Sequence, residues 1–330
     1  MNKISITLTK KAIGALSDIY KRMMEESRNQ RIVIKSIETA GIILDIKRED
    51  EIHPLISGNK YRKLKYNLME AKAKGAHTPL SFGGAYSNHI SALAYAGKKY
   101  DFQTIGVIRG DELGTCLEET LINNPTLKFA HENGMRFKFI SRAQYRNKDG
   151  THFTADLRDE FGDFFLIPEG GTNSFAVKGC EEILTARDRD YDFICVSVGT
   201  GGTMSGLINS AFEGQKILGF PSLKGDFLQD EIRKHVTRKN NWALINDYHF
   251  GGYAKINKNL ISFINEFYQQ TTIPLDPVYT GKMMFGIMEL IKKNYFKRNS
   301  KILAVHTGGL QGIAGMNQRL LKMKLPVICV

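Results

Sequence analysis

The residue best placed to do chemistry is Lys60, in the stretch Ser57–Leu64, which reads SGNKYRKL. Gly58 and Asn59 predict a turn, after which apolar residues recur at helical spacing as far as Gly75. Lys60 therefore lies where a loop becomes a helix, with Asn59 as the expected N-cap, and Gly58 lets another part of the chain approach closely. On its own this pattern fits a surface amine as well as a nucleophile, and residues downstream must decide.

A cluster of polar donors follows in Gly83–His89, which reads GGAYSNH. The segment comes after an apolar strand and opens a helix, and free backbone N–H groups at such a point bind anions. Ser87, Asn88 and His89 add a hydroxyl, an amide and an imidazole, so a carboxylate would be well held there. The alternative is an ordinary N-cap serine followed by an incidental histidine.

A second donor-rich loop lies between the apolar strand Phe193–Val198 and a helix that begins near Met204. It consists of Gly199, Thr200, Gly201, Gly202 and Thr203. Such a loop forms a nest of N–H and hydroxyl donors sized for a phosphate. It lacks the GK[ST] ending of a P-loop and the last glycine of GxGxxG, which favours a phosphate-bearing cofactor other than a nucleotide. A plain tight turn is the alternative.

Two more stretches end strands or loops in the same manner. Leu275–Lys282 reads LDPVYTGK and precedes the apolar helix Met283–Ile291, and His306–Gly309 reads HTGG and ends the strand Ile302–Val305. Each is either part of a site or only a connection.

The elements that must position these residues alternate between helix and strand. Strands are expected at 42–46, 80–82, 104–108, 137–140, 164–167, 193–198, 216–220 and 302–305, and helices at 10–26, 61–75, 88–99 and 118–133. Short β-branched runs separated by helices predict parallel sheets wrapped by helices, an α/β fold. The charged run 47–50 (KRED) fits a solvated turn or a structural ion-pair cluster equally well.

Composition narrows the class of protein. The 330 residues are 42% hydrophobic and 24% charged, which is typical of a globular domain, and no apolar run approaches the ~20 residues needed to span a membrane. The N-terminal segment is too charged for a secretory signal, and the four cysteines have no spacing that suggests disulfides or a metal site. These features favour a cytoplasmic protein. The net charge is +12, but the lysines are scattered over solvated helix faces, where Lys63 and Lys65 are also expected. Without a continuous basic run, this distribution argues against nucleic-acid binding.

Taken in order, SGNKYRKL, GGAYSNH, PEGGTN (Pro168–Asn173), VGTGGT, LDPVYTGK and HTGG resemble the 1-aminocyclopropane-1-carboxylate deaminase/D-cysteine desulfhydrase family. Its members are pyridoxal-phosphate enzymes of the tryptophan-synthase-β type. The resemblance spans about Gly41 to Leu325 and implies two open, twisted parallel-sheet domains. The large cofactor-binding domain would comprise 1–60 and 166–330, and a small α/β domain would be inserted at 61–165. It also implies a homodimer that binds pyridoxal 5'-phosphate and a small amino acid.

The resemblance assigns roles residue by residue. Lys60 would hold the cofactor as a Schiff base and, once released, act as a general base. The cofactor phosphate would be held by Gly199, Thr200, Gly201, Gly202 and Thr203. Asn88 would bond the ring hydroxyl, Tyr279 would lie against the ring and act in catalysis, and Thr307 would face the pyridine nitrogen. The substrate would be bound by Ser87 (also catalytic), Asn88, His89 and Thr280.

Two positions bear on the reaction. Deaminases of this family typically carry Glu and Leu at the positions of Thr280 and Thr307. Desulfhydrases carry threonine at both positions, as this chain does. A neutral hydroxyl at the pyridine nitrogen leaves it unprotonated, whereas a carboxylate favours the pyridinium form. We therefore expect conversion of D-cysteine to pyruvate, sulfide and ammonia. The alternatives are cyclopropane ring opening to 2-oxobutanoate, and a protein that binds the cofactor without turnover. Ile90 and Ser91, which follow His89, depart from the family pattern. The detailed substrate contacts are therefore left open.

Overall fold

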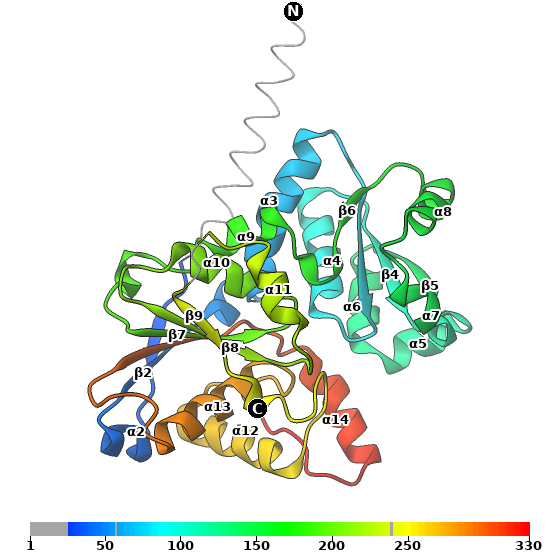
Figure 1. The fold of residues 1–330 in the computed structure, drawn as a ribbon. Coiled ribbons are helices and arrows are strands. Elements are labelled where there is room, and N and C mark those ends of the chain that lie inside the picture. The colour runs from blue at the N-terminus through cyan, green and yellow to red at the C-terminus, as the bar shows by residue number, and fades with distance from the viewer. Residues whose placement is uncertain (1–25, 57, 238–239) are drawn as a thin grey trace, which may run out of the picture. The chain divides into compact units, whose positions relative to one another are not determined.

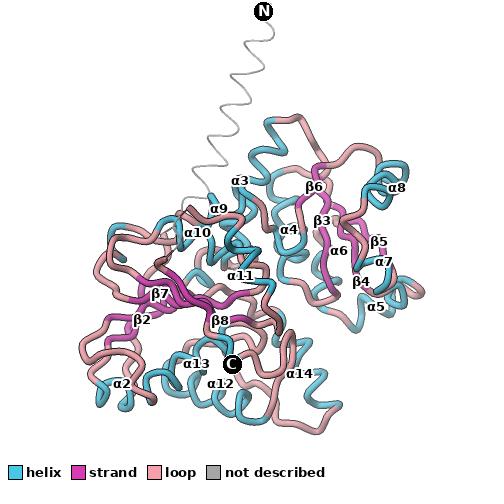
Figure 2. Tube along the Cα trace, viewed as in Figure 1, coloured by secondary structure: helices cyan, strands magenta, loops and turns pink. Residues whose placement is uncertain are grey.

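The computed structural model describes residues 26–56, 58–237 and 240–330, which form two compact α/β units (Figure 1). Unit 1 comprises the described residues Leu64–Phe175, and unit 2 comprises Glu26–Lys63 and Ala176–Val330. Each unit has its own sheet flanked by helices (Figure 2). The expected α/β class with parallel sheets is confirmed. The helix expected at 10–26 falls almost entirely outside the described residues.

Unit 2 is built on a six-stranded sheet in the order β1-β2-β10-β7-β8-β9, parallel except for the β1–β2 pair. Its strands are β1 (Asn29–Arg31), β2 (Ile43–Lys47), β7 (Phe193–Val198), β8 (Lys216–Pro221), β9 (Trp242–Leu244) and β10 (Lys301–Val305). The helices are α2 (Lys35–Ala40), α9 (Ser174–Cys180, which starts in unit 1), α10 (Gly202–Ser210), α11 (Phe227–Arg233), α12 (Lys258–Thr271), α13 (Thr280–Lys292) and α14 (Gly312–Lys322). Short 3-10 turns lie at Glu49–Glu51, Ala186–Asp188 and Asn246–Tyr248.

Unit 1 has a four-stranded parallel sheet in the order β5-β4-β3-β6. Its strands are β3 (Pro79–Gly84), β4 (Ile105–Arg109), β5 (Arg136–Ile140) and β6 (Phe165–Ile167). The helices are α3 (Asn59–Ala73, whose first turn belongs to unit 2), α4 (Asn88–Tyr100), α5 (Leu117–Asn123), α6 (Pro125–Glu132), α7 (Arg142–Arg146) and α8 (Thr151–Phe161). Short 3-10 turns lie at Asp111–Gly114 and Glu169–Gly171.

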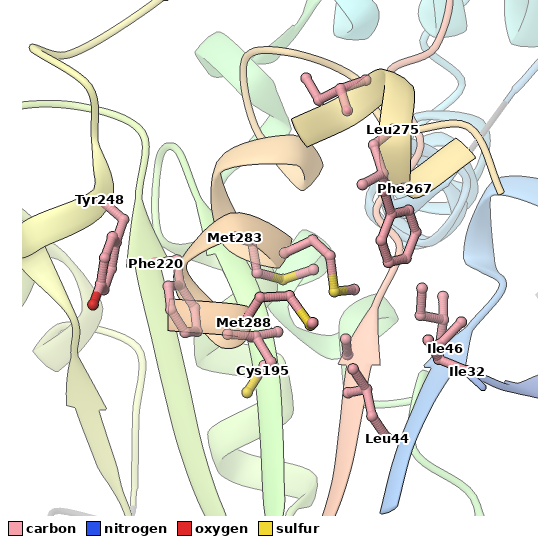
Figure 3. Close-up of a cluster of buried hydrophobic side chains, with 14 of the residues drawn as sticks. Ile32, Leu44, Ile46, Cys195, Phe220, Tyr248, Phe267, Leu275, Met283 and Met288 are labelled. Atoms are coloured by element: carbon pink, nitrogen blue, oxygen red, sulfur yellow. The ribbon is translucent and has the colours of Figure 1, made fainter. Parts of the chain in front are cut away.

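The core of unit 2 is built around its central strand, β7. Strand β7 reads FICVSV and is buried along nearly its whole length, as expected for a central parallel strand covered on both faces. On one face it packs with α13, and the buried apolar cluster on that face includes Met283, Met288 and Cys195 as well as Leu44 of β2 (Figure 3). The strands of this core end at the same edge, and the loops that follow them carry the polar residues singled out in the sequence.

The structure corrects one helix and settles the question of the KRED run. The helix expected at 118–133 is two helices, because Asn124 caps α6 with Pro125 in its first turn. The run 47–50 is a buried ion-pair cluster rather than a solvated turn: the Lys47 Nζ lies 2.8 Å from Asp188 Oδ2, and Arg62 pairs with Glu49 at 3.0 Å.

Three further observations concern the described part of the chain. No helix in it is both long and apolar enough to cross a membrane. The same residues contain no group of His, Cys, Asp and Glu arranged to hold a metal ion. Lys63 and Lys65 are buried, so the prediction that they lie on a solvated helix face is wrong.

Candidate functional site

The turn that carries Lys60 is fixed by backbone hydrogen bonds on two sides. The Gly58 N–H donates to the Glu49 carbonyl at 3.1 Å, and the Asn59 N–H donates to the Thr307 carbonyl at 3.3 Å. Gly58 has a positive φ of 67°, and a Cβ there would lie 2.0 Å from the Thr307 oxygen. Only glycine therefore lets this turn rest on the loop that follows β10.

The Lys60 amine is set up as a nucleophile. Its Nζ donates to Asn59 Oδ1 at 3.0 Å, and the same amide donates through Nδ2 to Thr203 Oγ1 at 2.8 Å. Burial, and then the neighbouring charge of Lys63, lower the pKa of Lys60 to about 7 against the opposing effects of Cys180 and Asp276. About half of the amine is then neutral at pH 7, compared with roughly 0.03% for an ordinary lysine.

The segment 199–203 runs into α10, whose first residue is Gly202, so it carries the N–H groups of a helix N-terminus. Gly201 has a φ of 86°, a left-handed conformation that non-glycine residues rarely adopt. Lys63 Nζ lies 3.4 Å from Thr200 Oγ1, and burial lowers the pKa of this lysine. A helix N-terminus, two threonine hydroxyls and an adjacent cation make an anion site suited to a phosphate. Sequence reasoning missed Lys63, although it lies one helical turn after Lys60.

The first turn of α13 is built around the buried carboxylate of Asp276. Its oxygens accept from the backbone N–H groups of Val278, Tyr279 and Thr280 at 2.8–2.9 Å. The Thr280 hydroxyl donates to Asp276 Oδ1 at 2.8 Å and accepts from the Asp276 N–H at 2.9 Å. Thr280 is fully buried, and its hydroxyl is thus engaged in capping this helix. Its expected contact with a substrate stays a prediction.

Tyr279 lies beside the phosphate-type loop. Its Cε1 would be 3.1 Å from a Cβ built on Gly199, so this glycine leaves room for the tyrosine ring. A second tyrosine, Tyr253, meets Tyr279 edge to face, with ring centroids 6.3 Å apart and an interplanar angle of 63°. Tyr253 was missed in the sequence, where the stretch GGYA gives no signal beyond a turn.

Thr307 follows β10 and faces the neighbouring strand. Its Oγ1 lies 3.0 Å from Ser197 Oγ on β7, so the partner of this hydroxyl is another hydroxyl. The preceding His306 is buried and shares a hydrogen bond of 2.7 Å between Nε2 and the Pro274 carbonyl. The Thr307 bond ties this loop to β7, and the His306 bond ties it to the chain that leads into Asp276 and α13.

Unit 1 carries the remaining predicted residues at the start of α4. Ser87 is the N-cap, and its Oγ accepts from the Ile90 N–H at 3.3 Å. The side-chain oxygen of Asn88 is buried without a hydrogen-bond partner among the described residues. His89 is 1% exposed, and its Nε2 lies 2.8 Å from Ser81 Oγ on β3. His89 is therefore held inside unit 1, and its contact with a substrate stays a prediction.

Unit 2 thus gathers Lys60, the loop 199–203, Tyr279 and Thr307 through direct contacts. A weakly basic amine is linked through Asn59 to a helix N-terminus suited to an anion, with an aromatic ring and a pair of hydroxyls in the same unit. Such an arrangement suits attack on, and proton transfer at, a molecule that carries a phosphate and a carbonyl group.

Comparison with known proteins agrees with that geometry. A family model described as "Pyridoxal-phosphate dependent enzyme" matches residues 38–308, which is most of the chain. The predicted resemblance to the deaminase/desulfhydrase family is confirmed by the relatives. One is the bifunctional D-cysteine desulfhydrase/1-aminocyclopropane-1-carboxylate deaminase, mitochondrial, of Arabidopsis thaliana, 30% identical over 297 residues that cover 83% of this chain and 74% of the relative.

Two other matches support the same grouping. The D-cysteine desulfhydrase of Klebsiella pneumoniae is 26% identical and covers 83% of this chain and 89% of its own. A crystal structure described as an ACC deaminase homologue superposes with a TM-score of 0.76 at 28% identity, covering 91% of this chain and 94% of that one.

Proposed function

The chain belongs to the family of pyridoxal-phosphate-dependent enzymes, and from that membership we propose that it deaminates a small amino acid by β-elimination. The preferred substrate in this proposal is D-cysteine, which would yield pyruvate, sulfide and ammonia. The observation that carries the proposal is the pair of hydrogen bonds, 3.0 and 2.8 Å long, that link the Lys60 amine through Asn59 to Thr203 in the first turn of α10. Relatives named for both activities support it.

The residues present fit pyridoxal phosphate. A largely neutral lysine amine suits an aldehyde, and the glycine-rich loop with Lys63 suits a phosphate dianion. In unit 1 the buried, unpaired side-chain oxygen of Asn88 is an atom that a further polar group would satisfy. When bound, the cofactor supplies an aldehyde and an electron-withdrawing ring that accepts the electron pair from the substrate α-carbon.

In the proposed mechanism Lys60 first holds the cofactor and then accepts the substrate α-proton at Nζ. Asn59 orients that nitrogen through its Oδ1 at 3.0 Å, and Thr203 holds the Asn59 amide in turn. The loop 199–203 and Lys63 would bind the phosphate, and Tyr279 would pack against the ring. Loss of the proton would allow the β-thiolate to leave as sulfide, and hydrolysis of the remaining enamine by water would give pyruvate and ammonia.

Substrate binding is assigned to the start of α4, where Ser87 and Asn88 offer a hydroxyl, an amide and helix N–H groups to a carboxylate. For His89 and Thr280 the structure favours an indirect part. His89 is bonded to Ser81, and Thr280 to Asp276, so each would hold neighbouring residues in place, and their direct contact with the substrate stays a prediction.

The choice of D-cysteine rests on Thr307. By family resemblance Thr307 would lie at the pyridine nitrogen, and its hydroxyl is paired with the Ser197 hydroxyl. Two neutral hydroxyls do not favour a protonated nitrogen, so the ring is a weaker electron sink than it would be beside a carboxylate. D-cysteine has an α-proton and a good leaving group, so its elimination requires less electron withdrawal by the pyridine ring. The cyclopropane acid has no α-proton, and opening its ring requires more.

The test is a panel assay on the cofactor-loaded protein. D-cysteine, L-cysteine and 1-aminocyclopropane-1-carboxylate are supplied separately, and sulfide, pyruvate, 2-oxobutanoate and ammonia are measured. We expect D-cysteine turnover to exceed ring opening by at least about tenfold, or roughly 1.4 kcal/mol in barrier. Equal or faster release of 2-oxobutanoate would favour the cyclopropane deaminase. Full cofactor occupancy without product from any amino acid would favour a cofactor-binding protein without turnover.

We also propose a cytoplasmic homodimer, whose large domain comprises 1–60 and 166–330 and whose small domain comprises 61–165. The family resemblance supports the dimer. Light scattering at working concentration tests it, and a monomer mass would exclude it.

A further inference from the structure

Helix α13 carries a buried ammonium group one turn after Tyr279. Lys282 is 1% exposed, and burial lowers its pKa to about 8 against the opposing charge of Asp276. About nine-tenths of the side chain is therefore charged at pH 7. Its Nζ donates to the His249 carbonyl at 2.9 Å and to the Gly252 carbonyl at 2.8 Å. Burying a charged lysine is costly unless its N–H donors are satisfied. These two bonds satisfy two of the three donors, so the loop that supplies the carbonyls is part of the reason the ammonium can be buried.

The carbonyls belong to a loop with an unusual backbone. Four of its residues have a positive φ: Phe250 at 55°, Gly251 at 92°, Gly252 at 114° and Ala254 at 54°. Left-handed conformations at phenylalanine and alanine cost of order 1 kcal/mol or more each and persist only where the surroundings impose them. The loop therefore requires an external anchor.

Lys282 closes two consecutive turns of this loop. The His249 carbonyl accepts from the Gly252 N–H at 3.0 Å as well as from the ammonium, and the Gly252 carbonyl accepts from the Lys255 N–H at 3.1 Å as well as from the ammonium. The Lys282 ammonium thus bonds to the acceptor carbonyl of each of the two turns. Charge-assisted bonds of this kind are stronger than neutral ones.

The same loop presents Tyr253 to Tyr279. The two rings meet edge to face at 6.3 Å, and Tyr253 is 46% exposed. Tyr279 precedes Lys282 by three residues, so both lie on the same turn of the chain at the start of α13. His249 is also one of the residues that line a cavity of about 260 Å³, together with Lys224 and Asn246.

We propose that Lys282 is a positioning residue: its ammonium fixes the loop 249–254 against the first turn of α13 and so sets where Tyr253 stands relative to Tyr279. Truncating this side chain frees the two turns, and Tyr253 loses its fixed place as a wall of the site. The kinetic part of this inference rests on the proposed function. The structural part, the anchoring of the loop, does not.

The experiment compares Lys282→Met with Lys292→Met, which removes an exposed lysine from the far end of the same helix. Hydrogen exchange should be at least about tenfold faster at the Gly252 and Lys255 amides in Lys282→Met and unchanged in Lys292→Met. Visible absorbance of the bound cofactor should stay at the wild-type level in both variants. KM for the preferred amino acid should rise about tenfold in Lys282→Met, with a much smaller change in kcat.

A second variant covers the case in which Lys282→Met does not fold. Lys282→Gln keeps a polar N–H donor on a side chain one bond shorter, and exchange at both amides should fall between the wild type and Lys282→Met. Unchanged exchange in the variant that folds would overturn the anchoring. Faster exchange with an unchanged KM would overturn the link to the site. If the wild type turns over no amino acid, the proposed function fails, and the exchange data still decide whether Lys282 holds the loop.

Discussion

Replacing Gly58 with alanine should displace the Lys60 turn. The new Cβ would lie 2.0 Å from the Thr307 oxygen and 2.4 Å from the Thr307 carbonyl carbon, both backbone atoms that cannot rotate away. Reaching a tolerable separation of 3.0 Å requires a shift of about 1 Å. The positive φ costs about 1 kcal/mol and the overpacking about 1–3 kcal/mol more, so the free energy of unfolding should fall by about 2–4 kcal/mol. A displacement of about 1 Å can also cost ~100-fold in kcat/KM.

Gly75→Ala is the matched control. Gly75 follows the other end of α3 with a φ of 68°, almost identical to that of Gly58, and a Cβ there meets nothing within 4 Å. This variant carries the backbone strain without the clash, so it should lose only about 1 kcal/mol and keep its cofactor. Chemical denaturation gives the stabilities, and visible absorbance with borohydride trapping reports cofactor on Lys60. Equal losses in the two variants would refute the claim that the turn rests on Thr307.

Three further predictions follow from the site. In the cofactor-free protein, labelling of Lys60 by an amine reagent should rise with a midpoint near pH 7, and Lys63→Gln should move the midpoint upward because it removes a positive charge; a midpoint above about 9 would contradict this. Gly201→Val should weaken cofactor retention, measured by absorbance after dialysis, more than it lowers stability, and full occupancy would count against the phosphate assignment. Thr280→Val should lower the free energy of unfolding by about 1–3 kcal/mol, because Asp276 loses a buried donor, while Thr280→Ser stays close to wild type; identical denaturation curves for the two would exclude the cap.

The fold was largely predictable because its signals are local. Strand β7 has the boundaries that its β-branched run predicts, and α4 begins at Asn88 as expected. Strand β9 was missed because three residues are too few to show the alternating pattern of a strand. The break before α6 was missed although Asn124 and Pro125 form a recognisable N-cap and first helical residue.

Site residues were less predictable, because burial depends on tertiary contacts. Lys63 reads as a surface lysine on helical spacing, and only the fold brings its amine to Thr200. His89 reads as a donor at a helix N-terminus, yet its ring turns back to Ser81 on the neighbouring strand. A short segment can predict that a polar side chain lies near a strand end, but it does not determine which way that side chain points.

The buried charges around the Lys60 turn share one physical role. Arg62 lies two residues after Lys60 and pairs with Glu49, whose backbone carbonyl also accepts from Gly58. Buried ion pairs contribute little net stability, because desolvation offsets their attraction. Their value here is conformational: breaking the pair leaves a buried charge, so the turn is confined to one register on the sheet edge. The low pKa of Lys60 depends on that confinement, since an amine free to reach water would regain its ordinary pKa.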